Sequence, residues 1–561
     1  MSSHLNTYSI FRLSFAICLI IALHLTLDYS EGLGLYLPNN AIIWIFIFFW
    51  IGLGTWKIHL DKVFYFSRFS KFLTLGIFFL FLPFIFQRDI PYDLIYIRFA
   101  GVIGILILYI CLQQFNFNKK DYTYFYFVII CSVLLKSSAE LIFNFFPDFL
   151  LNTKINIYLF NTLNHRNVQS TYLIFGTLLP LYYFLKSKKD LSKYSFKELI
   201  LYLTTFNVSI ILMLLQSRTA ILALPISIIL IFIGKYNFHK KIVVWALLTF
   251  FGLIIGNYLK KDFSKNTKDF SKNTRFTERS NSNFNNSIDL RIMFYEFSFD
   301  LWLEKPFTGH GYGTFLSTFR NYYAEQKSKD PDLIYLGPQN VLHPHNELCF
   351  WLVEGGIIPF TGLLIIAGAF ITLMWKTKSR KPLALLGCIF PILFHTQLEY
   401  PFYNSAIHLF LFCFFICQID QKYGTHYKFK NSFKILPKLL AIIIPLFSIL
   451  YLGTVLQTGY MITKFEKSDN KNIQLLQKAI NPNVLKVKYD NYLLKEYLRK
   501  AKKSKNKQKL KHYISIVEEN IEHSPFMFLY YDLATAYKAL GNMDKAEKIY
   551  NRAQYLYPST N

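Results

Sequence analysis

The chain has 561 residues, of which 53% are hydrophobic and 19% aromatic, and it carries a formal net charge of +27. The apolar residues are gathered in blocks such as "AIIWIFIFFWIGLG" and "FLTLGIFFLFLPFIF", which approach the roughly 20 residues that cross a bilayer. This blocked pattern excludes a water-soluble globular protein. It also makes the excess of Lys and Arg a topology signal rather than evidence for nucleic acid binding.

In chain order, about thirteen apolar segments predict an all-α polytopic membrane protein. They lie near 11–28, 38–56, 72–87, 98–115, 122–147, 168–186, 198–215, 219–234, 241–258, 347–375, 383–397, 404–418 and 436–457. Lys and Arg are concentrated in the short loops on the side of the N-terminus, which predicts a cytoplasmic N-terminus. The expected parts are N-terminal membrane helices (1–258), a large outside loop (259–346), C-terminal membrane helices (347–457) and an outside tail (460–561).

The outside loop has two predicted parts. Residues 259–287 repeat "DFSKNT" and continue with "SNSNFNNS", which is typical of a flexible polar linker. The following "DLRIMFYEFSFDLWLEKPFTGHGYGTF" predicts an amphipathic helix that Pro306 ends, and then a turn rich in glycine.

The stretch "LHPHNELCFWLVEGG" (342–356) places polar residues directly before an apolar run. Pro344 suits the first turn of a helix, so we expect a membrane helix with His345 and Asn346 in its first turn. Free N–H groups at such a helix start favour phosphate, and the dipole keeps a histidine neutral and able to act as a base. A polar cluster that only caps the helix is the alternative, above all for His343.

The end of the tail, "LATAYKALGNMDKAEKIYNRAQYLYP", predicts a tetratricopeptide-like pair of helices, and Pro525 and Pro558 indicate a weaker preceding copy. Such a domain binds or packs rather than catalyses. The lysine run at 499–512 indicates a solvated helix face, or else a contact for anionic lipid or an acidic partner.

Polar residues gather on the side predicted to lie outside. They are Arg88, Arg98, His165, Arg166, Asn167, Gln169, Gln216, Arg218, Arg291, His310, His343, His345, Asn346, His395, Glu399 and Tyr400. Arginines and histidines with few carboxylates predict a pocket for a polyanion, because guanidinium groups match phosphate oxygens. We expect no metal site, since a divalent ion bound through phosphates wants a carboxylate ligand and Glu354 lies too far along its helix. Anchoring at lipid headgroups is the alternative for Arg88 or Arg218 alone.

In combination these motifs resemble the bacterial O-antigen ligase and Wzy polymerase superfamily. The resemblance rests on "KPFTGHGYGTF" (305–315) and "HPHNELCFWLVEGG" (343–356), with "NHRNVQSTYLIFG" and "QSRTAILAL" upstream. Within the superfamily, "HTQLEYPFYNSAIHLFLF" and the exported tail are most similar to the pilin-type O-oligosaccharyltransferases. The resemblance implies a GT-C-like protein of the bacterial inner membrane with its active site on the periplasmic face.

The implied reaction transfers a preassembled glycan from undecaprenyl diphosphate to a Ser/Thr hydroxyl of an exported protein such as pilin, without a metal or cofactor. By resemblance His345, with Asn346 beside it, is catalytic and deprotonates or orients the acceptor hydroxyl. The implied donor diphosphate site consists of Arg218, Arg291, Arg166, His165, Gln169 and Arg88. The implied acceptor side consists of Glu399, Tyr400 and His343.

Two alternatives remain at this point. An O-antigen ligase to lipid A core, or an O-antigen polymerase, would belong to the same superfamily, but the exported tail and "LEYP" favour a protein acceptor. A transporter of lipid-linked sugars would also be polytopic and basic. Transporters tend to show two related halves, whereas this sequence shows no such internal symmetry and its polar residues collect on one face.

Overall fold

The computed structural model describes residues 2–145, 165–186, 195–266 and 284–558, except for a few positions. These are Thr26, Asp28, Ser30, Glu31, Leu33, Gln339, Lys378, Lys434, Asp469 and Asn470. The described residues are mostly helical with very little sheet, which confirms the predicted all-α polytopic class. The chain forms two compact units: unit 1 is Met1–Thr74, Val102–Asn281 and Ala367–Leu456, and unit 2 is Leu75–Gly101, Ser282–Ile366 and Gln457–Asn561.

The α-helices, in chain order, are α1 (Ser2–Ala16), α2 (Pro38–Asp61), α3 (Arg68–Phe81), α4 (Tyr92–Leu112), α5 (Lys119–Phe145), α7 (Arg166–Leu173), α8 (Phe175–Lys186), α9 (Phe196–Leu215), α10 (Arg218–Gly234), α11 (Lys240–Asn266), α12 (Phe284–Glu304), α13 (Phe315–Lys329), α14 (Glu347–Gly355), α15 (Ile357–Lys376), α16 (Lys381–His395), α17 (Pro401–Asn404), α18 (Ala406–Tyr423), α19 (Leu436–Lys467), α20 (Gln474–Gln477), α21 (Lys486–Lys503), α22 (Lys507–Ile521), α23 (Met527–Ala539) and α24 (Met543–Leu556). Short 3₁₀ or π-helical turns cover Ile17–Ile21, Ala22–His24, Gly34–Tyr36, Leu82–Ile85 and Pro482–Leu485. The strands are β1 (Val63–Ser67) and β2 (His426–Lys430).

Within the described residues, ten helices are long and apolar enough to cross a membrane, and α10 and α16 are shorter apolar helices. The segment expected at 404–418 is α18. The single membrane helix expected at 347–375 is wrong, because two helices occupy this stretch. They are the nine-residue α14 and the longer α15, and they are separated at Gly356, whose φ is +72°.

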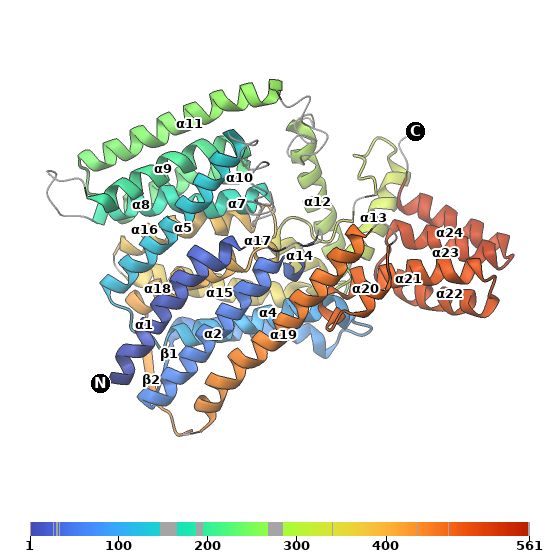
Figure 1. The fold of residues 1–561 in the computed structure, drawn as a ribbon, viewed down its shortest axis with the longest axis horizontal. Helices are drawn as coiled ribbons and strands as arrows, with labels where there is room; N and C mark the ends of the chain where they lie inside the picture. Colours follow the sequence, from blue (N-terminus) through green and yellow to red (C-terminus); the bar gives the residue numbers. More distant parts are fainter. Residues whose placement is uncertain are drawn as a thin grey trace. The chain divides into compact units, whose positions relative to one another are not determined.

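Helices of unit 1 pack in close pairs, with α9 along α11 and α10 along α16 (Figure 1). The second pair approaches closely because Gly234 has no side chain, and a Cβ there would lie 2.2 Å from the backbone nitrogen of Ala384. Small residues at such crossings are typical of membrane helix packing. The buried Trp50 of α2 contacts both α18 and α1 in this unit. Its ring lies 4.3 Å from that of Phe410 in α18, and its Nε1 donates to Ser14 Oγ in α1 at 2.9 Å.

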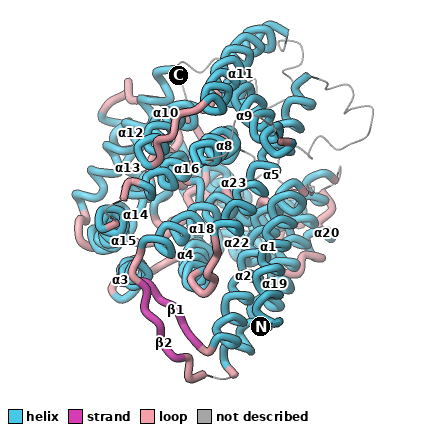
Figure 2. The backbone as a smooth tube through the Cα atoms, turned by 90° about the vertical axis from the view of Figure 1, so that its left-hand side faces the viewer, coloured by secondary structure: helices cyan, strands magenta, loops and turns pink. Residues whose placement is uncertain are grey.

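A two-stranded ribbon also belongs to unit 1, and Figure 2 shows it in magenta. Strands β1 and β2 pair antiparallel, from Val63 opposite Lys430 to Ser67 opposite His426. The ribbon joins the connection after α2 to the connection after α18.

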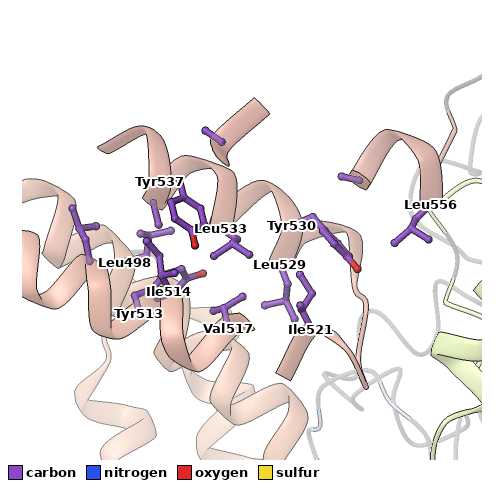
Figure 3. Packing of buried hydrophobic residues seen from close by; sticks show 14 of the residues in the cluster. Leu498, Tyr513, Ile514, Val517, Ile521, Leu529, Tyr530, Leu533, Tyr537 and Leu556 are labelled. Carbon is purple, nitrogen blue, oxygen red and sulfur yellow. The ribbon is translucent and has the colours of Figure 1, made fainter. Parts of the chain in front are cut away.

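In unit 2 the tail is a stack of helices, α21 to α24, around one hydrophobic core (Figure 3). Its centre includes Leu498, Tyr513, Val517 and Leu533. The helical character of the tail is as expected, and its assignment to the tetratricopeptide class stays a prediction. The preceding helix α19 runs to Lys467, past residue 460 where the tail was expected to begin.

Part of the expected linker is helical. Residues 259–266 continue α11 and residues 284–287 begin α12, whereas 267–283 lie outside the described residues. Helix α12 ends at Glu304, before Pro306, and positive φ angles follow at Gly309, Gly311 and Gly313. This confirms the predicted helix and glycine turn.

Candidate active site

The residues predicted for the site divide between the two units. Unit 1 holds His165, Arg166, Gln169, Arg218, Glu399 and Tyr400, and unit 2 holds Arg88, Arg291, His343, His345 and Asn346.

In unit 1 the buried carboxylate of Glu399 is the centre of the group. Asn167 Nδ2 donates to Glu399 Oε1 at 2.6 Å. His165 Nδ1 and His395 Nε2 each lie 3.2 Å from Glu399 Oε2. His165 is 39% exposed at its side chain whereas Glu399 is 7% exposed, so a buried anion orients a histidine that solvent can reach. The sequence predicts His165 for the donor side and Glu399 for the acceptor side, but the structure brings the two into direct contact.

Hydrogen bonds extend from Glu399 toward Arg218. Ser217 Oγ donates to Asn167 Oδ1 at 2.8 Å. Ser217 Oγ also caps α10, because it accepts the N–H of Ala220. Arg218, the first residue of α10, is half-buried. The backbone position of Arg218 is therefore tied to Glu399 through Ser217 and Asn167.

A second set of bonds extends from Glu399 into the helices. Thr171 Oγ1 lies 3.1 Å from both His395 Nδ1 and His408 Nε2, and His408 Nδ1 lies 2.8 Å from Ser405 Oγ. Both histidines are fully buried. Sequence reasoning missed Thr171, Ser405 and His408. A histidine within the apolar "SAIHLFLF" was an available signal, because ionisable residues in membrane helices are costly and usually have a partner or a role.

The other predicted residues of unit 1 differ in exposure. Arg166, the first residue of α7, is exposed, and Tyr400 is half-buried with its ring 6.5 Å from that of Tyr403. Gln169 is 2% exposed, and its Nε2 has no hydrogen-bond partner among the described residues. A buried amide without a partner is costly, and a ligand oxygen is the kind of group that would satisfy it.

In unit 2 the structure corrects the expected start of the helix after Pro344. Asn346 is the N-cap of α14, and its Oδ1 accepts the N–H groups of Leu348 at 2.9 Å and Cys349 at 3.1 Å. His345 precedes this cap in a left-handed conformation, with φ of +60°, and is not in the first turn. Asparagine is among the best N-cap residues, which explains where the helix begins. Two N–H groups that were expected to be open to phosphate are therefore occupied by Asn346.

Helix α12 forms one wall around His345. The imidazole stacks on Phe294 with the ring centroids 5.6 Å apart and an interplanar angle of 8°, and Tyr295 donates to the His345 carbonyl at 3.5 Å. Arg291 is half-buried and precedes these two residues by three and four positions. Residues with this spacing share a helix face, so Arg291 lies on the side of α12 that contacts His345.

His343 supports the unusual backbone of His345. It is 5% exposed, and its Nδ1 accepts the backbone N–H of His345 at 3.0 Å. Its Nε2 lies 3.5 Å from Glu347 Oε2, and its ring lies 4.5 Å from that of Phe350. Left-handed conformations are uncommon outside glycine, so this bond offsets part of the cost of holding His345 there.

The glycine turn is held on the end of α14 by Glu354. Its Oε1 accepts the N–H groups of Gly313 at 3.0 Å and Phe315 at 3.2 Å. Its Oε2 pairs with Arg98 Nη2 at 2.6 Å. A Cβ at Gly309 would lie 2.5 Å from the Glu354 carbonyl oxygen, so the close contact requires glycine.

Arg98 is thus a structural cation. Its side chain is 9% exposed and packs against four aromatic rings, of which Phe350 is nearest, 4.7 Å from its guanidinium carbon. The expectation that Arg98 belongs to the anion-binding set is not supported, because Glu354 and these rings already surround it.

Sequence reasoning also missed Gln87, whose Nε2 donates to the carbonyls of Thr308 and Glu354 at 2.8 Å each. The neighbouring Arg88 is exposed. His310 Nε2 donates to the Leu301 carbonyl at 2.7 Å, and burial lowers the pKa of His310, which keeps it neutral at pH 7. His310 therefore has a structural role in the turn.

The family described as O-Antigen ligase matches residues 203–364, which include Arg218, Arg291, the glycine turn and the His343–Asn346 stretch. The chain belongs to the O-antigen ligase and Wzy polymerase superfamily. A second match within this superfamily, described as Virulence factor membrane-bound polymerase, C-terminal, covers residues 383–561 and so contains Glu399, Tyr400 and the tail. A search of curated proteins finds no match. Superfamily membership supports a multi-pass membrane protein with a function of the glycan ligase or polymerase type, and the O-antigen ligase family acts on lipid-linked glycans.

Proposed function

We propose that this superfamily member is an O-oligosaccharyltransferase. It moves a preassembled glycan from undecaprenyl diphosphate to a Ser/Thr hydroxyl of an exported protein such as pilin, at the periplasmic face of the bacterial inner membrane. The observation that carries the proposal is the position of Arg291 on the face of α12 that holds His345 through Phe294 and Tyr295. On that face a cation lies one helical turn from the two residues that contact His345, and it suits a diphosphate.

In the proposed reaction His345 takes the proton of the acceptor hydroxyl. The hydroxyl oxygen forms a bond to the anomeric carbon of the glycan, and the bond from that carbon to the phosphate oxygen breaks. The undecaprenyl diphosphate leaves with the electron pair. Arg291 and Arg218 stabilise its charge, since guanidinium forks match phosphate oxygens. Because arginines neutralise the leaving group, the proposal includes no metal or cofactor. Asn346 and His343 position His345.

The remaining site residues have proposed roles in substrate binding. His165, Arg166, Gln169 and Arg88 bind the donor. Gln169 Nε2, which has no hydrogen-bond partner among the described residues, suits an oxygen of the donor's glycan or diphosphate. We assign Glu399 first to orienting His165, because of their contact, and we keep Tyr400 on the acceptor side. The concentration of Lys and Arg in the loops on the side of the N-terminus supports the periplasmic orientation.

An O-antigen polymerase, or a ligase to lipid A core, is the second candidate. The C-terminal match is described as belonging to a membrane-bound polymerase and extends through the tail. The presence of the tail therefore does not distinguish a protein acceptor from a glycan acceptor, and "LEYP" is the remaining sequence argument for protein.

The deciding experiment supplies purified full-length protein with undecaprenyl-diphosphate-linked glycan and three acceptors in parallel: a pilin peptide, lipid A core, and a second donor molecule. We expect glycopeptide to form without a membrane gradient. We expect His345→Ala to abolish its formation and Arg291→Lys to slow it, with both variants inserted in the membrane as wild type is. Elongated lipid-linked glycan or modified lipid A core, without glycopeptide, would replace the proposed acceptor. Movement of the donor without any transfer would indicate a transporter.

A further inference from the structure

The last helix of the tail touches the large loop of the same unit through Tyr557, which follows α24. Tyr557 is 5% exposed, and its hydroxyl lies 3.2 Å from Asn340 Oδ1 and within hydrogen-bond distance of the Pro525 carbonyl. The hydroxyl is the donor in both contacts, so its one proton is shared between the Pro525 carbonyl and Asn340 Oδ1. The tail is therefore bonded to a residue that precedes His343 by three positions.

Helix α13 holds the same stretch of chain from its other side. Its Tyr323 hydroxyl donates to the Ile334 carbonyl at 3.0 Å and accepts the N–H of Leu336 at 3.1 Å. Its Arg320 Nη1 donates to the Gly337 carbonyl at 3.4 Å. Residues 334–338 and 340–342, which we call the connecting segment, are thus fastened at their start by α13 and near their end by the tail.

Arg320 joins these two supports. It is 1% exposed, and its guanidinium carbon lies 4.3 Å from the centre of the Tyr557 ring. A buried cation over an aromatic face is a favourable contact, and truncating either partner leaves the charge poorly compensated. Ala324, one turn further along α13, belongs to the hydrophobic core of the tail. Helix α13 and the tail therefore share one packed interior.

The connecting segment leads directly into the stretch that shapes the histidine pair. His343 follows it, and Nδ1 of His343 accepts the N–H of the left-handed His345. A strained backbone persists only where its surroundings hold it, and His345 has support from α12 on one side and from His343 on the other. A shift in the connecting segment would move His343 and release that second support.

We infer that Tyr557 of the tail is a positioning residue for His345, acting through Asn340, the connecting segment and His343. The inference rests on the proposed role of His345 in glycan transfer. It gives the tail a part in the chemical step, because the tail sets the conformation of the catalytic loop instead of serving only to recognise the acceptor.

The test compares full-length wild type, Tyr557→Phe and Asn340→Ala in lipid nanodiscs. Tyr557→Phe keeps the ring over Arg320 and removes only the hydroxyl. We expect about a tenfold lower kcat with an unchanged KM for the acceptor, and faster amide exchange in peptides that cover residues 340–349. Asn340→Ala should also lower kcat, and the double variant should lose no more kcat than Tyr557→Phe alone, because the two changes share the Tyr557–Asn340 contact, whereas the bond to the Pro525 carbonyl is lost only in Tyr557→Phe. Tyr555→Phe is the matched control, since Tyr555 lies two residues away on the exposed side of α24 and should behave as wild type.

Three outcomes overturn the inference. One is wild-type kcat with wild-type exchange at 340–349 in Tyr557→Phe. Another is a raised KM with unchanged kcat, which would make the tail an acceptor-binding module. The third is faster exchange throughout α23 in the same variant, which would show that the hydroxyl only stabilises the tail. A failure of the proposed function would be distinguishable from these outcomes. In that case His345→Ala would transfer glycan as wild type does, while amide exchange in Tyr557→Phe would still show whether the Tyr557 contact holds residues 340–349.

Discussion

His343 Nδ1 accepts the backbone N–H of His345 at 3.0 Å, so one histidine of the pair sets the main-chain conformation of the other. A bond from a side chain to the N–H two residues later is the geometry of an Asx-turn, which Asn and Asp form readily. The two imidazoles therefore have different tasks, although both lie in one short motif.

This relationship predicts different results for two substitutions of His343. His343→Ala removes the acceptor and should lower glycan transfer about 10-fold, the effect of losing a hydrogen bond of about 1–1.5 kcal/mol. His343→Asn can form the Asx-turn and should keep most of the activity. Initial rates with saturating donor and acceptor check this prediction. Equal losses in the two variants would show that the imidazole of His343 itself takes part in the reaction.

Glu399→Gln should impair transfer without unfolding the protein. The amide can still accept from Asn167, but it carries no charge to orient His165 and His395. A hydrogen bond to a charged group contributes about 1.5–3 kcal/mol, so we expect transfer to fall about 10- to 100-fold. Initial rates measure this loss, and Glu325→Gln on the exposed face of α13 is the control. An effect confined to the acceptor KM would return Glu399 to the acceptor side.

Gly356→Ala should destabilise unit 2. Gly356 has a φ of +72°, and a Cβ there would lie 2.4 Å from the Phe307 carbonyl oxygen. Backbone strain alone costs about 1–3 kcal/mol, and the clash with the glycine turn adds to it. The measurement is the thermal unfolding midpoint in detergent. Gly368→Ala is the matched control, because beyond the nearby backbone of its own helix no atom of the described residues lies within 4 Å of its added Cβ. Alanine favours a helix, so its midpoint should stay equal or rise.

His310 should make stability depend on pH. Burial lowers the pKa of His310 in the folded protein below its ordinary value of 6.5. The unfolded chain therefore binds a proton more readily, and stability is full above about pH 6.5 and falls as the pH drops below it. His310→Gln keeps a donor for the Leu301 carbonyl and cannot titrate. Unfolding midpoints between pH 5 and 8 should fall less for this variant than for wild type, and parallel curves would contradict the prediction.

The sequence predicts the helices well because apolar blocks and charged loops are local signals. It also predicts the glycine turn, since Pro306 and three nearby glycines leave few alternatives. The break at Gly356 was missed because the stretch is apolar on both sides of it. The pair Gly355–Gly356 after Glu354 was an available local signal for a turn, whereas the close approach of Phe307, 49 positions earlier, was not readable from the sequence.

In the candidate site, too, local signals were readable from the sequence and long-range contacts were not. The residue types that suit a polyanion are readable from the sequence, but their partners are not. Arg98 looks like a further cation for phosphate until Glu354, 256 positions later, is found beside it. The N-cap role of Asn346 was within reach of sequence reasoning, since Asn is favoured there, and Pro344 gave a competing signal for where the helix starts.

The ribbon of β1 and β2 has a consequence for how the protein is made. Ser67 leaves the ribosome long before its partner His426, and at roughly 5–20 residues per second the interval is about 20–70 s. During this time β1 has an open edge, and the helices around Trp50 lack Phe410. Unit 1 extends to Leu456 and is therefore completed only when the ribosome has passed that residue, and a chain that stops before residue 410 leaves β1 without its partner strand and Trp50 without Phe410.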